Sequence, residues 1–194
     1  MTQVYTFKII YQECENKIWR TFEVSSNYDL ASLGYMVLAS FRTMAYHLFS
    51  INCKGINYET DIENYGEYPL LREQKLSNLS LTIGEHMQMI YDFGCEQIFD
   101  IELIDISEMP RGAGRSYPRV IDGAGKGIID DMSAYELCEI IKGTDKNGKS
   151  DYKTENSLGD MIVWDYRDYE IDFDNCLLKG EISMIREAYE TEAY

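Results

Sequence analysis

The chain has 194 residues and 45% of them are apolar, enough for one ordinary domain with a real core rather than a disordered chain. Acidic residues outnumber basic ones by 34 to 18, which gives a formal net charge of −16. Duplex nucleic acid is bound mainly by neutralising its phosphates with Lys and Arg. The charge therefore disfavours direct nucleic-acid binding, although a local basic patch would escape that argument.

Cysteine usage and hydropathy point to a soluble protein of a reducing compartment. A disulfide framework or a zinc knuckle would need an even cysteine count or tight spacing. This chain has five cysteines, which are scattered along the sequence and form no C-x-x-C pair: Cys14, Cys53, Cys95, Cys138 and Cys176. No apolar run approaches the ~20 residues of a membrane span, and no signal-peptide pattern opens the chain. We expect free thiols, a cytoplasmic location and no membrane partner.

The first elements are a hairpin and a helix. Residues 4–11 are rich in β-branched and aromatic types, and residues 18–24 follow after a polar break, so the two segments predict a β-hairpin. Alternation in the second strand places four residues on one side: Ile18, Arg20, Phe22 and Val24. Asn27 or Asp29 can cap a helix over 30–42, whose apolar residues recur at helical spacing.

Strands dominate the middle of the chain. A third strand is predicted over 47–52, followed by a polar, Tyr-rich excursion over 56–80. Residues 87–93 and 98–104 predict a second hairpin. In its second strand, apolar residues alternate with Asp100 and Glu102, so one face is buried and the other is acidic.

Regular patterning disappears over 107–131, which contains two prolines and five glycines and is predicted to be a long loop. Ser133 and Glu136 have the spacing of a capping box, which predicts a helix over 134–142. Two further helices are expected in the acidic C-terminal part, over 158–166 and 181–189.

This order of elements predicts an α+β fold, with a mixed sheet covered by one main helix in a β-grasp-like arrangement. A long Gly/Pro loop and a helical C-terminal part complete it. We expect an α+β domain over residues 1–145 and an acidic, partly helical extension over 146–194 that packs on it.

Carboxylates are densest near the second hairpin. They are Asp92, Glu96, Asp100 and Glu102. They are the first choice of ligands if a metal binds, but charge on an exposed sheet face explains them as well. The two histidines, His47 and His86, are too few to anchor a typical transition-metal site, and His47 is interpreted as structural. The sequence therefore predicts no metal, no cofactor and no identifiable catalytic set.

The 107–131 loop is the one clearly basic stretch. It contains Arg111, Arg115, Arg119 and Lys126. These residues are candidates for binding an anion or a partner, or for neutralising the chain's own acidic C-terminal part. Gly123-Ala124-Gly125-Lys126 resembles the end of a P-loop, but Gly127 replaces the Ser or Thr that would hold magnesium.

Six short landmarks follow one another along the chain: Ile18-Trp19-Arg20, the capped helix near Leu30, His47-Leu48, Tyr91-Asp92-Phe93-Gly94, Ile101-Glu102-Leu103 and Tyr117-Pro118-Arg119. Their order and spacing resemble the plasmid pRiA4b Orf-3-like family over about residues 3–142, with a looser continuation through Trp164 and Phe173-Asp174. The resemblance implies an α+β domain often encoded on plasmids or mobile elements, without an established biochemical activity.

The chain departs from that family at several positions. The resemblance implies histidine where this chain has Gly34, Phe49 and Phe99, tryptophan near Gln97, and cysteines at Val120 and in 127–131. Imidazole and thiolate are the ligands of borderline-soft metals. Any metal-linked function of relatives is therefore expected to be lost or changed here.

We interpret the protein as a non-enzymatic, cytosolic interaction domain whose partner is another protein. Two alternatives stay open: a metal-dependent enzyme using the carboxylates near the 91–102 hairpin, and a nucleic-acid-associated factor of a mobile element. The first requires those carboxylates to share a cleft, and the second requires the basic loop to converge with exposed aromatic side chains.

Overall fold

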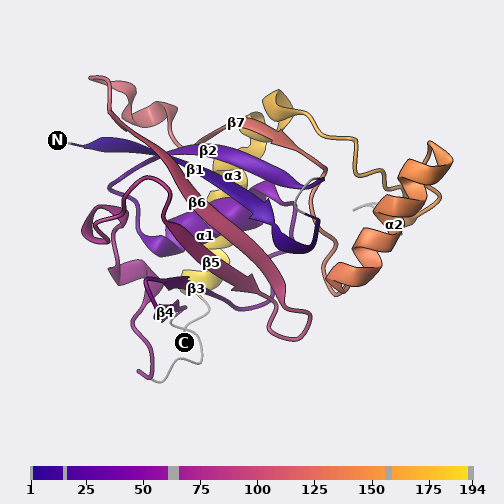
Figure 1. Ribbon diagram of the computed structural model, residues 1–194, viewed down its shortest axis with the longest axis horizontal. Coiled ribbons are helices and arrows are strands. Elements are labelled where there is room, and N and C mark those ends of the chain that lie inside the picture. Colours follow the sequence, from indigo (N-terminus) through magenta and orange to yellow (C-terminus); the bar gives the residue numbers. More distant parts are fainter. Residues whose placement is uncertain (1, 15–16, 61–65, 156–158, 192–194) are drawn as a thin grey trace.

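The structure, a computed structural model, describes residues 2–14, 17–60, 66–155 and 159–191. One sheet organises it, with strand order β4-β3-β5-β6-β1-β2-β7 (Figure 1). Its strands are β1 (Gln3–Tyr11), β2 (Trp19–Ser25), β3 (Phe49–Cys53), β4 (Ile56–Glu59), β5 (His86–Tyr91), β6 (Gln97–Glu108) and β7 (Arg119–Ala124).

The α+β class is confirmed, but every pairing of neighbouring strands is antiparallel rather than mixed. The two predicted hairpins are the β1–β2 and β5–β6 pairs. The direction of pairing between β1 and β6 depends on the path of the chain between them, which local alternation does not reveal.

Three helices accompany the sheet: α1 (Leu30–Ser40), α2 (Ala134–Asn147) and α3 (Ile171–Thr191). Asp29 caps α1 as predicted, its carboxylate accepting from the backbone N–H of Ser32 at 2.7 Å. Every residue of α1 is buried, because the helix is enclosed between the sheet and α3, both of which it contacts (Figure 1). The capping box of Ser133 and Glu136 begins α2 as predicted.

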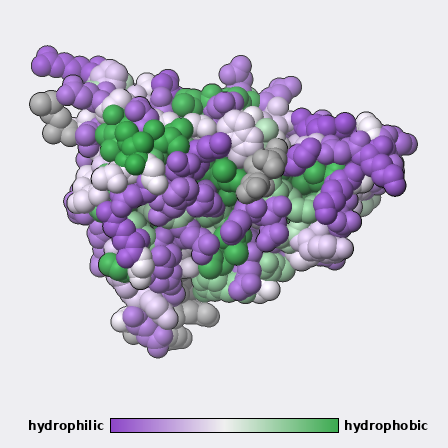
Figure 2. All heavy atoms as spheres, in the orientation of Figure 1, coloured by the Kyte–Doolittle hydropathy of each residue, from purple (hydrophilic) through white to green (hydrophobic). Residues whose placement is uncertain are grey.

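The core lies between the sheet and α1. It is lined from the sheet by Phe7, Ile9, Phe22, Val24, Phe49, Ile51, Met89, Tyr91, Phe99, Ile101 and Leu103. No helix covers the opposite face of the sheet in the described structure (Figure 1). Hydrophilic side chains cover much of the face shown in Figure 2, and apolar ones form separate groups there. The predicted alternation in β6 is confirmed, since Phe99, Ile101 and Leu103 are buried while Asp100 and Glu102 are partly exposed.

Arg20 of β2 is fully buried and ties α3 to the sheet. Its Nε and Nη2 donate to the carbonyl of Ser40 at 3.1 and 2.9 Å, and its Nη1 donates to that of Ala124 at 2.8 Å. The guanidinium lies 3.7 Å from the ring centroid of Tyr169 and its Nε lies 3.8 Å from Asp174 Oδ2. Desolvation lowers the pKa of Arg20 to about 10, so the side chain stays charged at neutral pH.

The structure corrects two predictions in the second half of the chain. The predicted loop over 107–131 contains the end of β6, a 3-10 turn over Ala113–Ser116 and the edge strand β7. The predicted helix over 158–166 is wrong in its described part, where Met161–Val163 forms β9 and pairs with β8 (Lys153–Glu155). The predicted helix over 181–189 is part of the longer α3.

The expectation of free thiols is wrong for two cysteines. Cys14 and Cys138 form a disulfide, with their Cα atoms 6.2 Å apart, and so join the turn after β1 to α2. They are 124 residues apart in sequence, so their spacing gave no signal. Cys53, Cys95 and Cys176 are free. In the described part of the chain, no helix is long and apolar enough to span a membrane.

Candidate functional site

His47, Asp92 and Asp131 meet at one end of the sheet, although the chain separates them widely. Strands β3 and β5 are antiparallel, with Phe49 opposite Tyr91. His47 lies just before β3 and Asp92 just after β5, so the pairing brings them to the same end. The backbone N–H of Asp92 donates to the carbonyl of Leu48 at 3.0 Å. Asp131 comes from the loop between β7 and α2.

The three side chains are close enough to share one ion. His47 Nε2 lies 2.9 Å from Asp131 Oδ1 and 3.5 Å from Asp92 Oδ2. Their ligand atoms all lie within 4.8 Å of one another. Within the described ranges, no other set of three or more His, Cys, Asp or Glu side chains meets that criterion.

Asp92 is held in place by its own turn. Its Oδ1 accepts from the backbone N–H groups of Gly94 and Cys95, at 3.1 and 3.3 Å. Its other oxygen, Oδ2, makes no hydrogen bond within the described structure. This oxygen is buried, and the residue as a whole is only 6% exposed, so bulk water does not replace the missing donor. Burying a carboxylate oxygen without a hydrogen-bond donor costs free energy, because the oxygen loses its hydration and forms no hydrogen bond in the protein.

Asp131 is oriented from the loop side. Its Oδ2 accepts a hydrogen bond from the hydroxyl of Tyr46, and this bond, together with that from His47, lowers the pKa of Asp131. The neighbouring Asp130 accepts from the Tyr91 hydroxyl at 2.6 Å and from the Met44 backbone N–H at 2.8 Å. The loop that carries Asp131 is thereby attached to both β5 and the segment before β3.

Both aspartates adopt a left-handed backbone conformation, with φ of +56° at Asp92 and +59° at Asp131. This region is uncommon for residues other than glycine, although aspartate tolerates it better than most. Such conformations cluster at functional sites, where the surrounding structure holds them. Here the hydrogen bonds described above do so.

The site borders an acidic cavity of about 530 Å³. Four carboxylates line it, from Asp130, Asp131, Glu136 and Glu139, and none of its described lining residues is Lys or Arg. A cleft lined by charge of one sign concentrates ions of the opposite sign. The acidic cavity therefore favours binding of a cation at the adjoining cluster.

The donor set fits a divalent transition-metal ion, and so does one of its two measured separations, the other being shorter at 2.9 Å. At metal–ligand distances of about 2.0–2.2 Å, two tetrahedral ligand atoms lie about 3.4 Å apart, close to the 3.5 Å between His47 Nε2 and Asp92 Oδ2. Cys95 adjoins the cluster, but burial and the neighbouring Asp92 raise the pKa of its thiol. It is therefore a thiol rather than a ready thiolate ligand.

The acidic group expected near the 91–102 hairpin is not brought together. Only Asp92 lies in the cluster with His47. Glu96 is in the β5–β6 turn with a φ of +51°. Asp100 pairs instead with His86, whose Nδ1 lies 3.0 Å from it, and Glu102 lies opposite Lys8 in the β1–β6 pairing.

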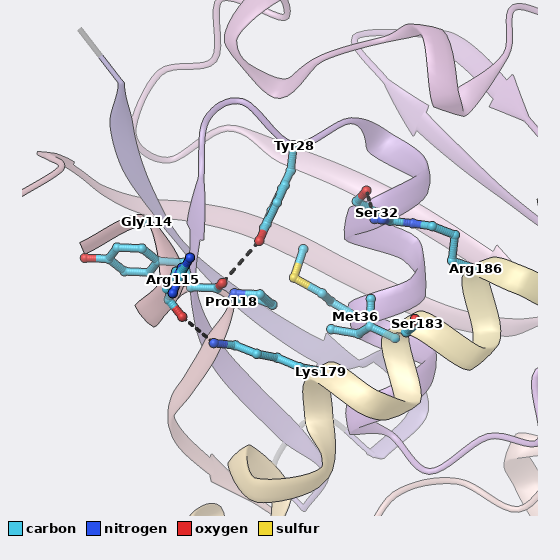
Figure 3. Close-up of a pocket in the computed structure, with 11 residues that line it drawn as sticks. Tyr28, Ser32, Met36, Gly114, Arg115, Pro118, Lys179, Ser183 and Arg186 are labelled. Atoms are coloured by element: carbon cyan, nitrogen blue, oxygen red, sulfur yellow. Dashed lines mark hydrogen bonds between the residues drawn. The ribbon is translucent and has the colours of Figure 1, made fainter. Parts of the chain in front are cut away.

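The basic loop residues do not converge either. Arg119 pairs with Glu23 at 2.5 Å, and Lys126 lies 4.0 Å from Asp168 of the C-terminal part. Arg111 is exposed, and Arg115 lines a separate cavity (Figure 3). Two of the four basic side chains are thus paired with carboxylates, and one lines a cavity.

Sequence reasoning interpreted His47 as structural and did not single out Asp131. The available signal was the pair of landmarks His47-Leu48 and Tyr91-Asp92-Phe93-Gly94, which lie side by side in the fold and supply two of the three ligands. For Asp131 the signal was indirect: it lies in the 127–131 segment where the resemblance implies cysteines, but only the fold of that loop brings it to the cluster.

Comparison with known proteins supports the resemblance. The family model described as plasmid pRiA4b ORF-3-like protein matches residues 3–175. The chain belongs to this family. The matched range contains the whole sheet and all three residues of the cluster.

A solved structure shares the fold of this family member. It is the crystal structure of a protein of unknown function, MM3350 from Methanosarcina mazei Go1, with a TM-score of 0.70 and 21% sequence identity. The alignment covers 90% of this chain and 97% of that one. No match is found among curated proteins.

Proposed function

We propose that the protein binds a divalent transition-metal ion through His47 Nε2, Asp92 Oδ2 and Asp131 Oδ1. The observation that carries this function is the buried Asp92 Oδ2, which has no hydrogen-bond donor and lies 3.5 Å from His47 Nε2. An ion bound between these atoms would compensate the desolvated oxygen that the protein alone leaves unsatisfied.

The donor chemistry narrows the ion. Imidazole suits zinc, copper, iron and nickel, and carboxylates are shared with manganese and magnesium. One imidazole with two carboxylates therefore favours Zn²⁺ or Mn²⁺ over Mg²⁺, which prefers oxygen ligands and retains its waters. Sites with three protein ligands leave a position for water or another ligand. Here that position would face the acidic cavity beside Asp131.

Metal binding at this cluster differs from the expectation of no metal. It also differs from the ligand set suggested by the hairpin carboxylates, of which only Asp92 takes part. On this view a metal-linked function of relatives is retained here with different ligands. The ligands of this cluster are one histidine and two aspartates, with no cysteine.

Metal content and titration test the site. Metal-free protein is titrated with ZnCl₂ by calorimetry, and bound metal is measured after dialysis. We expect one Zn²⁺ per chain, much weaker binding of Mg²⁺, and at least a tenfold loss of Zn²⁺ affinity in Asp92→Asn and Asp131→Asn, because each substitution removes a charged ligand.

The chain offers a matched control in the His86–Asp100 pair, which has the same residue types at 3.0 Å but no third ligand among the residues that the structure describes. His86→Gln and Asp100→Asn should leave Zn²⁺ affinity unchanged. Absence of stoichiometric Zn²⁺, or an equal loss of affinity in the His86 and Asp131 variants, would exclude the site.

The second candidate function is binding of a basic protein segment, favoured by the exposure of β9. Met161, Ile162 and Val163 are 59%, 42% and 49% exposed. A lysine-rich extended segment could add to this strand and complement the net charge of −16. A peptide of alternating Lys and Val is the probe. Ile162→Asp should abolish binding, whereas Ile83→Asp, at a more exposed position elsewhere (59%), should not. No binding to the unsubstituted protein would exclude this function.

A further inference from the structure

A second cavity, of about 620 Å³, lies between α1, α3 and the 3-10 turn over Ala113–Ser116 (Figure 3). It does not include any residue of the His47 cluster. Its walls come from three separate parts of the chain: Ser32 and Met36 on α1, Arg115 on the turn, and Lys179, Ser183 and Arg186 on α3.

The charge of this cavity is opposite to that of the protein. Among the described residues that line it, Arg115, Lys179 and Arg186 are basic and none is acidic, although the whole chain has 34 acidic and 18 basic residues. Like charges repel one another, so three cations around one cavity are unfavourable unless an anion offsets them. Arg115 and Lys179 in particular differ from Arg119 and Lys126, which each have a carboxylate partner.

The cationic groups retain unused donors. Among the described residues, no carboxylate lies within ion-pair distance of Arg115 or Lys179. Lys179 Nζ donates to the backbone carbonyl of Arg115, which holds the ammonium at the cavity wall and leaves two of its three N–H groups. Figure 3 shows Lys179 and Arg115 on the same side of the cavity.

The opposite side combines a fixed cation with hydroxyl groups. Arg186 Nη2 donates to Ser32 Oγ at 2.9 Å, so the guanidinium is held against α1, and its Nε lies 3.8 Å from the exposed Glu190. Ser183 adds a hydroxyl on the same wall (Figure 3). Between the two sides, the buried Met36 and Ile182 give the cavity an apolar wall.

We infer that this cavity binds a small organic phosphate monoester, with its phosphate at Arg115 and Lys179 and its organic part over Met36 and Ile182. A phosphate monoester carries a charge of about −1.5 to −2 at neutral pH and three acceptor oxygens. One lysine and one arginine together supply two positive charges and several N–H donors, which match a phosphate better than a single carboxylate. The apolar wall would add affinity for the organic group. This site is independent of the metal proposed at His47, and neither depends on the other.

Phenyl phosphate is the probe, and inorganic phosphate and benzoate separate the contributions of its two parts. Binding is measured by calorimetry at fixed ionic strength on the full chain. We expect saturable binding of one phenyl phosphate, at least tenfold tighter than that of either inorganic phosphate or benzoate. Arg115→Gln and Lys179→Gln should each weaken it at least tenfold, and thermal melting should confirm that both variants remain folded.

Arg111→Gln is the matched control, since Arg111 belongs to the same loop and carries the same charge but does not line the cavity. It should leave the affinity for phenyl phosphate within twofold. An equal loss in the Arg111 and Arg115 variants would reduce the effect to general electrostatics and overturn the site. Absence of saturable binding would overturn it too, and equal binding of benzoate would overturn the phosphate assignment.

Discussion

The close approach of α1 to β3 at Gly34 predicts a specific loss of stability in Gly34→Ala. A Cβ atom at this position would lie 2.2 Å from Cε2 and 2.6 Å from Cζ of Phe49, whereas ordinary contacts begin near 3.4 Å. The Phe49 ring cannot easily move, because it is fully buried and packs against Tyr35 and Tyr189, with centroids 5.9 and 5.3 Å away. The methyl group must therefore displace the helix from the sheet.

The magnitude follows from two opposing effects. Overpacking a core costs about 1–3 kcal/mol, and a contact this short belongs at the upper end. Replacing a helical glycine with alanine by itself stabilises the helix by about 1 kcal/mol. We expect a net loss of about 2 kcal/mol in the free energy of unfolding, or about 4–8 °C in Tm for a chain of this size.

Urea denaturation and thermal melting measure the effect. Gly180→Ala in α3 is the control, since nothing lies within 4 Å of a Cβ there, and it should gain about 0.5–1 kcal/mol. In a Phe49→Leu background, Gly34→Ala should lose at least ~1 kcal/mol less than in the native chain, because the ring that it meets is gone. A neutral or stabilising Gly34→Ala would refute the steric reasoning.

Three further outcomes test other features. Arg20→Met should lower the free energy of unfolding by about 3 kcal/mol in urea titrations, because it removes the buried donors and leaves Asp174 less compensated. Ser133→Ala should cost about 1 kcal/mol and speed amide exchange in the first turn of α2. Hydrogen bonds from Arg167 lower the pKa of Asp165 from 3.8 to about 2, so its stabilisation is present above about pH 4 and is lost as pH falls toward 2. In Asp165→Asn, acid denaturation should be less steep over that interval.

Local patterns were sufficient for the elements whose determinants are close in sequence. The first hairpin, the Asp29 cap of α1 and the Ser133 capping box each depend on residues within one element or its flanks. The predicted alternation also placed Arg20 on the same side of the second strand as Ile18, Phe22 and Val24, and all four side chains are buried.

Strand β7 was missed because the glycines that suggested a loop have a packing role. A Cβ on Gly123 would lie 2.9 Å from the carbonyl oxygen of Trp19, and one on Gly125 would lie 2.3 Å from that of Lys17. These glycines let the chain approach β2 closely, and Gly125 also has a φ of +79°. Composition alone cannot separate this requirement from flexibility.

The candidate metal cluster depended on contacts between distant segments. His47 and Asp131 are 84 residues apart, and their contact follows from the β3–β5 pairing together with the path of the loop before α2. Of the three side chains, the sequence analysis named only Asp92 as a possible ligand, because nothing local showed that His47 and Asp131 would meet it. The same holds for the cationic cavity, whose basic residues come from segments predicted as a loop and an acidic extension.

The central place of β1 has a consequence for how the chain is made in the cell. Its hairpin with β2 can form as soon as both strands leave the ribosome, but its other neighbour, β6, ends at Glu108. Until then the long edge of the nascent hairpin that β6 later occupies is open to pairing with other chains. Slow synthesis between β2 and β6 should therefore increase aggregation more than a pause after β6.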